Sequence, residues 1–147
     1  MKIIAENRKA RFNYEIIDSL EAGIVLTGAE VKSSKAGHMS LKNSYATIRE
    51  EEIYLTNTHI APYKFAKNKD YDPTRSRKLL LNKKEIKSLI GKLQTKGLTL
   101  VPLRAYIKRG MIKIDLGLGK GKKLIDKRET IKKRDLEREI RRELKNK

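Results

Sequence analysis

The segment LTLVPLRAYIKRGMIKIDLGLG, residues 98–119, places an apolar side chain at every second position along two arms. The first arm carries Val101, Leu103, Ala105 and Ile107, and the second carries Ile112, Ile114, Leu116 and Leu118. A period of two predicts an antiparallel hairpin with one apolar face and one wet face, where Arg104, Tyr106, Lys113 and Asp115 would lie. Because Pro102 cannot donate to a strand ladder, it predicts an edge position or a bulge.

The rest of the first 118 residues adds a second hairpin and two short helices. Residues 44–60 alternate in the same way, with a turn at 49–52. Thr27 and Glu30 have the spacing of a capping box, which predicts a helix over about 28–36. Asn82 and Gly97 bracket the apolar stripe of NKKEIKSLIGKLQTKG, which predicts a second helix. About six short strands and two helices predict a mainly β (α+β) fold, a small closed antiparallel β-barrel with short flanking helices.

The C-terminal segment has no comparable apolar face. From Lys120 onward it holds thirteen basic and six acidic residues, and its few apolar residues fall on two narrow stripes of a helical wheel. We therefore expect a domain at 1–118 and a basic, helix-prone tail at 119–147 that does not pack against it. The alternating glycines at 117, 119 and 121 lack the Lys-Ser/Thr step of a phosphate loop, and we interpret them as a flexible exit from the last strand.

The net charge of the chain is +18, with 36 Lys and Arg against 18 Asp and Glu. A charge this one-sided favours a polyanionic partner, with nucleic acid ahead of a membrane surface, since the tail lacks Trp, Phe and a broad apolar face. The loop at 62–78 mixes aromatic side chains for bases with cations for phosphates, although its aromatics could instead cover the mouth of the barrel. The loop residues in question are Tyr63, Phe65 and Tyr71, among Lys64, Lys67, Lys69, Arg75, Arg77 and Lys78.

The sequence shows no pattern typical of catalysis or metal binding. It contains no Cys, and its two histidines, His38 and His59, stand at no ligand spacing from each other or from a carboxylate pair. It has no signal-like run near Met1 and no apolar stretch of about 18 residues. We expect a monomeric cytoplasmic protein that is not an enzyme and uses no cofactor and no metal.

Five separated blocks, NRKARFNYEI, LEAGIVLTGAEVKSSKAG, DPTRSRKLLLNKKEI, KGLTLVPL and GKGKKLIDKRETIKKR, resemble the SsrA-binding protein family, SmpB. The resemblance runs in order over almost the whole chain. It implies an OB-like β-barrel with flanking helices and a C-terminal tail that is disordered when free. It also implies a non-catalytic adaptor that binds the tRNA-like domain of transfer-messenger (SsrA) RNA and delivers it to stalled ribosomes. This process, trans-translation, rescues the ribosome and tags the nascent chain. The tail is implied to dock on small-subunit RNA in the empty mRNA path.

The resemblance assigns two groups of site residues. The RNA-binding group consists of Asn7, Arg8, Arg11, Glu21, Lys78, Leu80 and Asn82, and the ribosome-binding tail group of Lys122, Lys123, Asp126, Lys127 and Arg128. Ile125 departs from the family, which often has an aromatic residue or His there, so stacking at this position becomes apolar contact.

Structural explanations stand beside several of these assignments. Asn82 also caps a helix, and Leu80 could simply be buried. An acid such as Glu21 on an RNA-facing surface of a basic protein suggests that it accepts a hydrogen bond from a base or ribose hydroxyl. Glu30 requires no RNA role, because its capping box suffices to explain it.

Two other functions remain open on the sequence alone. A structural ribosomal protein would bind ribosomal RNA permanently, whereas the adaptor would purify with one discrete tRNA-like RNA. An RNA-processing enzyme would show nuclease activity that a chelator abolishes, although the sequence contains no carboxylate cluster for a metal.

Overall fold

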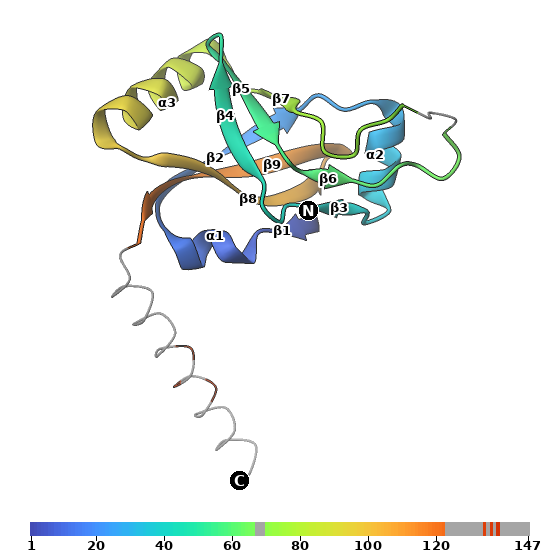
Figure 1. Ribbon diagram of the computed structural model, residues 1–147, viewed down its shortest axis with the longest axis horizontal. Helices are drawn as coiled ribbons and strands as arrows, with labels where there is room; N and C mark the ends of the chain where they lie inside the picture. The colour runs from blue at the N-terminus through green and yellow to red at the C-terminus, as the bar shows by residue number, and fades with distance from the viewer. Residues whose placement is uncertain (67–69, 123–133, 135, 137, 139–147) are drawn as a thin grey trace.

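The computed structural model describes residues 1–66 and 70–122, together with residues 134, 136 and 138. This part of the chain forms three helices and nine strands (Figure 1). In chain order they are β1 (Lys2–Glu6), α1 (Arg8–Asn13), β2 (Tyr14–Ile24), α2 (Gly28–Lys35), β3 (Met39–Ser40), β4 (Tyr45–Arg49), β5 (Glu52–Thr56), β6 (His59–Ile60), β7 (Arg77–Leu80), α3 (Lys83–Lys96), β8 (Thr99–Lys108) and β9 (Met111–Gly121).

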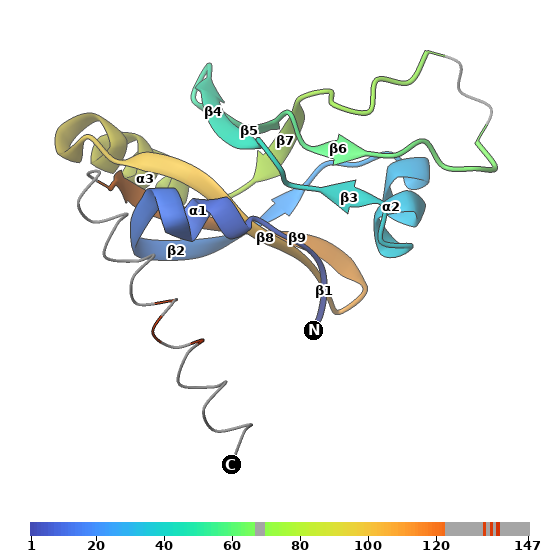
Figure 2. The ribbon, with the colours of Figure 1, turned by 60° about the horizontal axis from the view of Figure 1, so that its bottom comes forward.

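Seven of the strands form one antiparallel sheet in the order β1-β8-β9-β2-β7-β5-β4, and β3 pairs with β6 in a second, small sheet. The large sheet curls so that β4 packs against β8 (Figure 2). In the described part of the chain no ladder of hydrogen bonds joins the two edges, so the sheet is open and the predicted closed barrel is not confirmed. The short β7 makes only two residue pairs with each neighbour. In the described residues the β4–β5 hairpin contacts β8 without pairing to it.

The main core fills the inside of the curled sheet. Leu55, Leu79 and Ile114 are fully buried there, and Ile86 and Leu89 of α3 pack onto them. The predicted stripe and end residues of α3 are confirmed, with Asn82 at the N-cap, in a capping box with Glu85, and left-handed Gly97 at the C-cap. The predicted capping box of α2 is confirmed as well, with Thr27 as the N-cap residue.

A bulge in β8 divides this strand between the two faces of the sheet. The register shifts just after Pro102, which confirms the bulge interpretation of this proline. Val101 pairs with Gly117, whereas Ala105 pairs with Ile114, so Val101 and Ala105 point to opposite faces. The single apolar face predicted for this arm is therefore wrong, because the bulge reverses the alternation of side chains.

A second, smaller core lies on the opposite face of the sheet, which we call the outer face. Ala10 of α1 packs there on Val101 and Leu103, and Tyr14 and Ile16 border the cluster. The helix α1 thus covers part of the outer face. The sequence pattern predicted neither α1 nor this second core.

The strand β9 continues to Gly121, three residues past the predicted end of the domain at Leu118. Gly119 is buried and pairs with both neighbouring strands. A Cβ atom at Gly119 would lie 2.9 Å from the Cβ of Tyr14, so only glycine fits under this ring. The prediction of a flexible exit at these glycines is wrong, since Gly117 and Gly119 allow side chains from β2 and β8 to lie close over β9.

Candidate nucleic-acid interface

Charged side chains from three strands meet on the outer face. Glu21 of β2 pairs with Asp115 of β9, and Asp115 pairs in turn with Arg104 of β8. Arg104 Nε lies 3.3 Å from Asp115 Oδ2. Two residues before Asp115 on β9, Lys113 pairs with Gly23 of β2 and with Tyr106 of β8. Each acid on this part of the face therefore has a cation beside it.

Glu21 is held in one orientation by its neighbours. The Tyr106 hydroxyl donates to Glu21 Oε2, and Lys108 Nζ lies 3.3 Å from the same oxygen. The hydrogen bond from Tyr106 lowers the pKa of Glu21 against the opposing effect of burial, and Lys108 lowers it further. Tyr106 is only 4% exposed, so the prediction of a wet side chain at this position is wrong. Within the described residues no hydrogen bond reaches Glu21 Oε1, which is placed to accept one from a ligand.

The strand β7 alternates between the core and the outer face. Arg77 and Leu79 are buried, while Lys78 and Leu80 point outward. Leu80 is 51% exposed and pairs with Gly23, two residues along β2 from Glu21. The alternative that Leu80 is a core residue is therefore excluded, and Leu80 presents an exposed apolar side chain on the same face as Glu21.

Asn82 and Asn7, both predicted to bind RNA, make hydrogen bonds that have a structural role. Asn82 Oδ1 accepts from the backbone N–H of Glu85 at 2.8 Å, which accounts for its oxygen as the cap of α3. Asn7 Nδ2 donates to the carbonyl of Pro102 at 2.9 Å, and its backbone N–H donates to the carbonyl of Leu103 at 2.8 Å. Asn7 thus fixes the start of α1 onto the bulge of β8. Lys78 is exposed, with its Nζ atom 3.7 Å from Glu52 Oε1.

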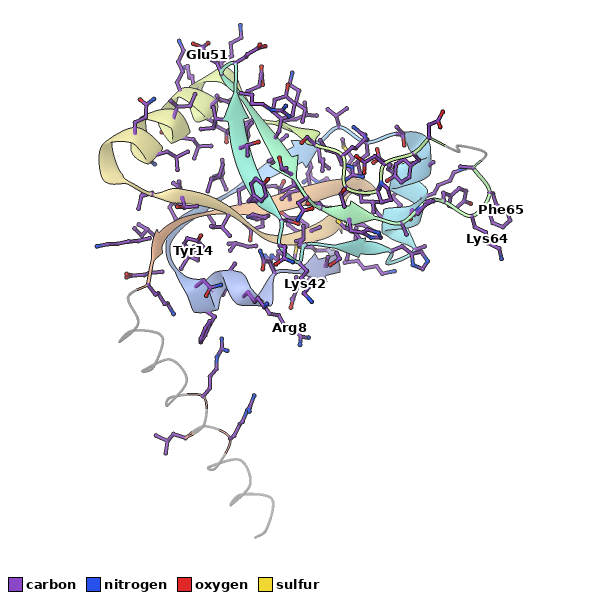
Figure 3. All side chains as sticks on the ribbon, in the orientation of Figure 1. Arg8, Tyr14, Lys42, Glu51, Lys64 and Phe65 are labelled. Carbon is purple, nitrogen blue, oxygen red and sulfur yellow. The ribbon has the colours of Figure 1, made fainter. Side chains whose placement is uncertain are left out.

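Arg8 and Arg11 of α1 lie beside a cleft of about 620 Å³. Three further arginines line the same cleft, namely Arg104 of β8 and Arg134 and Arg138 from the C-terminal segment. The sequence assignment missed these three. A spacing of four residues on a helix-prone segment places Arg134 and Arg138 on one side, and this was the available signal. Figure 3 shows Arg8 projecting from α1, away from the sheet.

The predicted tail residues fall mostly outside the described part of the chain. Lys123, Asp126, Lys127 and Arg128 are not described. The backbone N–H of Lys122 donates to the carbonyl of Asn13 at 3.0 Å, so this residue is attached to the domain.

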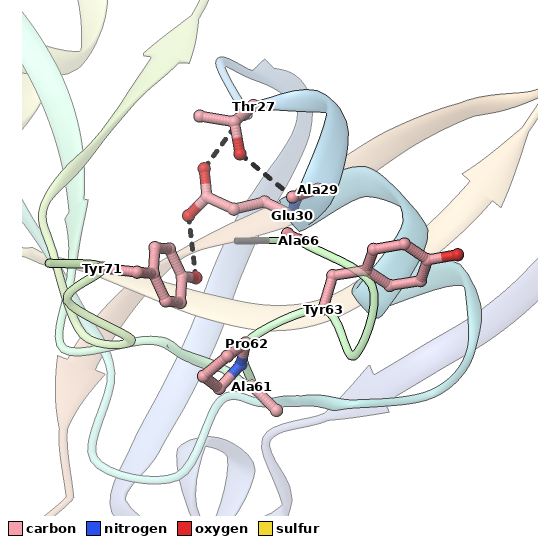
Figure 4. Close-up of a pocket in the computed structure, with 8 residues that line it drawn as sticks. All are labelled: Thr27, Ala29, Glu30, Ala61, Pro62, Tyr63, Ala66 and Tyr71. Atoms are coloured by element: carbon pink, nitrogen blue, oxygen red, sulfur yellow. Dashed lines mark hydrogen bonds between the residues drawn. The ribbon is translucent and has the colours of Figure 1, made fainter. Parts of the chain in front are cut away.

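A buried carboxylate, that of Glu30, joins α2 to the loop between β6 and β7 (Figure 4). Glu30 is 1% exposed. Its carboxylate accepts from the Thr27 backbone N–H at 3.0 Å, from Arg77 Nε at 2.6 Å, from the Tyr71 hydroxyl at 3.1 Å and from Arg75. The capping box is present but does not suffice to explain Glu30. Its arginine partners lie more than 40 positions away, beyond the reach of any local pattern.

Arg77 is fully buried within this network. Its Nη1 donates to the carbonyl of Thr58 at 2.7 Å, and its Nη2 donates to the carbonyl of Pro73 and to the Tyr71 hydroxyl, both at 3.0 Å. Burial by itself would raise the pKa of Glu30, but the hydrogen bonds from Arg75, Thr27 and Arg77 outweigh it and lower the pKa to about 2. The prediction that Tyr71, Arg75 and Arg77 face RNA is therefore wrong for Arg77, and the other two are engaged with Glu30.

The described residues provide groups that suit binding to RNA. They contain no cluster of three His, Cys, Asp or Glu side chains that could hold a metal ion. No helix within them has the length and apolar character needed to cross a bilayer. The outer face and its cleft instead combine guanidinium groups, an oriented carboxylate and an exposed leucine. Such groups contact phosphates, ribose hydroxyls and bases respectively.

Comparisons with known proteins point to one family. A family model described as SmpB protein matches residues 4–146. The chain is 55% identical over 145 residues to an SsrA-binding protein of Trichodesmium erythraeum, which covers 98% of this chain and 93% of that protein. It is 57% identical over 144 residues to an SsrA-binding protein of Magnetococcus marinus, with 98% and 96% covered. A solved structure described as "tmRNA-SmpB: a journey to the center of the bacterial ribosome" matches with 51% identity and a TM-score of 0.65, over 81% of this chain and 84% of the other. The chain therefore belongs to the SmpB family.

Proposed function

We propose that this protein is an SsrA-binding protein, which binds transfer-messenger RNA and acts with it on stalled ribosomes in trans-translation. The observation that carries this conclusion is the extent of the similarity. Relatives that bear this name match at about 55% identity over nearly the whole chain, and a ribosome complex of tmRNA and SmpB shares the fold. The protein would act in the cytoplasm, where translation takes place, as a monomer.

The outer face supports a binding role in which the RNA undergoes no covalent change. Arg8, Arg11 and Arg104 are placed around one cleft, where they would neutralise successive phosphates of the tRNA-like domain. Glu21 Oε1 would accept from a ribose hydroxyl or a base amino group, and Leu80 would pack on the adjacent nucleotide. We infer that Asn7 and Asn82 contribute by holding α1 and α3 in place. The protein needs no cofactor for this role and serves as an adaptor, not an enzyme.

The tail supplies the second contact in this proposal. Lys122, Lys123, Lys127 and Arg128 would meet phosphates of small-subunit RNA along the empty mRNA path. Phosphates repel Asp126, so this residue would accept a hydrogen bond from a base or ribose edge, or cap a helix that forms on docking.

Replacing Glu21 tests recognition on the outer face, because specificity and long-range charge predict opposite signs. Glu21→Ala makes the protein more positive, yet we expect weaker binding to the tRNA-like RNA in a filter titration and unchanged or tighter binding to a non-specific RNA. Glu51→Ala is the matched control, since it removes one exposed acid at the tip of the β4–β5 hairpin. Equal or tighter specific binding by Glu21→Ala would remove this residue from the interface.

Tyr106→Phe extends the test to the group that orients Glu21. The variant should weaken specific binding in the wild-type background and have no further effect in the Glu21→Ala background, because the hydroxyl acts through the carboxylate.

A structural ribosomal protein is the alternative function. Sequencing the RNA that copurifies from native cells distinguishes the two, since the adaptor should bring down transfer-messenger RNA as a discrete species.

A further inference from the structure

Two aromatic rings stand at the surface of the loop between β6 and β7, apart from the outer face. Phe65 is 75% exposed, and its ring centre lies 5.5 Å from that of Tyr63 in an edge-on arrangement. Covering this ring would remove apolar surface from water, which favours binding of a partner there. Figure 3 shows Lys64 and Phe65 at the end of the molecule opposite Tyr14.

Cations flank both rings. Lys32 Nζ of α2 lies 5.5 Å from the centre of the Tyr63 ring, and Lys64 Nζ lies 5.6 Å from the centre of the Phe65 ring. We call these four residues, Lys32, Tyr63, Lys64 and Phe65, the aromatic platform. Exposed aromatic faces with ammonium groups beside them suit a single-stranded nucleic acid, whose bases stack on rings while its phosphates meet the cations. Charge complementarity therefore favours a polyanion over an apolar protein surface.

The base of the platform is fixed before any partner arrives. Tyr63 lines a pocket between α2 and the loop, together with Ala61, Pro62 and the buried Glu30 (Figure 4). The Ser33 hydroxyl of α2 donates to the carbonyl of Ala61 at 2.6 Å, and the Glu30 carboxylate holds the far end of the loop through Arg75. This ordered base reduces the conformational entropy that the loop backbone would lose on binding.

The platform is continuous along the chain with the outer face. Exposed Val25 follows the end of β2, its backbone N–H donates to the carbonyl of Lys78 at 2.9 Å, and α2 begins three residues later. Residues 25–27, of which Val25 and Thr27 are exposed, connect the surface of Glu21 and Leu80 to the helix that carries Lys32. One RNA molecule lying on the outer face can extend to the platform.

We propose that the aromatic platform stacks unpaired bases of the transfer-messenger RNA, with Lys32 and Lys64 on the adjoining phosphates. This inference rests on the proposed function and adds a second RNA contact to it. Phe65 supplies the open stacking face, and Tyr63 sets the angle of the pair from the loop base.

Equilibrium binding of the full-length protein to transfer-messenger RNA, measured at several salt concentrations, tests the platform. Phe65→Ala should weaken binding about tenfold, which corresponds to about 1.4 kcal/mol, without changing the salt slope, because no counterion contact is lost. Phe65→Trp should retain binding, since it keeps an aromatic face. Lys64→Ala should weaken binding and reduce the salt slope by roughly 0.7. Ile48→Ala, at an exposed apolar position on β4, is the control and should bind as the wild type does.

The outcomes separate this proposal from the proposed function. If wild-type protein fails to bind transfer-messenger RNA, the proposed function itself is wrong, and the platform proposal falls with it. If wild type binds and Phe65→Ala binds equally well, the platform is overturned while the function stands. Equal RNA binding combined with weaker binding of the Phe65→Ala complex to ribosomes would also overturn the proposal, since the platform would then contact ribosomal RNA.

Discussion

At the scale of single residues, Glu30 is the carboxylate among the described residues whose ionisation matters most for stability. Its pKa falls from 4.5 to about 2 in the folded protein, because the hydrogen bonds that it accepts outweigh the effect of its burial. A carboxyl with a lowered folded pKa binds protons more readily in the unfolded chain. Its contribution to the free energy of unfolding is therefore complete above pH 4.5 and is lost as pH falls towards 2.

Glu30→Gln keeps the shape of the side chain but leaves the buried Arg77 guanidinium without its counter-charge. We expect it to lower the free energy of unfolding by about 3–5 kcal/mol at neutral pH. The shift in pKa corresponds to about 3 kcal/mol, so the difference between wild type and variant should shrink by about that amount between pH 4.5 and pH 2. Urea unfolding of both proteins across this range measures it.

Glu51→Gln, at an exposed site on the β4–β5 turn, is the control and should follow the wild-type pH profile closely. If the destabilisation by Glu30→Gln were constant from pH 6 to pH 2, the ion pairs with Arg75 and Arg77 would not be its cause.

At the scale of elements, the close approach of β2 to β9 makes two nearby glycines unequal. A Cβ at Gly119 would lie 2.9 Å from the Cβ of Tyr14, whereas one at Gly121 would meet nothing within 4 Å. Gly119→Ala should therefore destabilise the protein by about 1–3 kcal/mol, while Gly121→Ala should be neutral or slightly stabilising. Thermal unfolding of the pair measures the difference. Equal melting temperatures would contradict the tight packing of Tyr14 on β9.

Elements with local signals could be predicted from the sequence. The capping residues Thr27 and Asn82 mark helices that the structure confirms, and both main hairpins follow from alternation. The side-chain direction in β8 could not be predicted. A bulge at Pro102 changes the register by one residue, but the alternation of apolar and polar residues in the sequence stays regular across it. The short β7 and the helix α1 carry no clear periodicity. Their places depend on pairing with β2 and on packing over the outer face.

The candidate site was predictable only in part for the same reason. The resemblance indicated Glu21 and Leu80, and register brings them to neighbouring strands on one face. Tyr106, 85 positions from Glu21, could not be identified as its partner, since only the pairing of β2, β9 and β8 brings the two together. The tail assignments from Lys123 to Arg128 remain predictions, because they lie outside the described residues.

At the scale of the whole molecule, the domain and the tail should be separable. The last strand ends at Gly121, and Lys122 makes a hydrogen bond back to α1. Truncation after Lys122 should leave a domain that unfolds cooperatively and binds transfer-messenger RNA with a smaller salt slope, since Arg134 and Arg138 leave the cleft. Loss of cooperative unfolding in circular dichroism would contradict this division.

The tail residues Asp126, Lys127 and Arg128 should be required for tagging and not for RNA binding. Replacing Asp126, Lys127 and Arg128 together by Ala should spare binding of transfer-messenger RNA and abolish tag addition in a reconstituted assay with stalled ribosomes. Asp126→Lys distinguishes a docked tail from a purely electrostatic one, which would tolerate the added charge. Full tagging by the triple variant, or a parallel loss of RNA binding, would refute the separate role of the tail.

The sharing of one carboxylate by two arginines also limits how this sequence can evolve. A substitution at Glu30 or Arg77 alone leaves the partner's buried charge unpaired, so neither position can change by itself without a large loss of stability. The route to an apolar replacement requires both positions to change together, and the double change should be less harmful than the sum of the single ones. Positions 30 and 77 should therefore be epistatic, so that residues in α2 and β7 change together although 47 positions separate them.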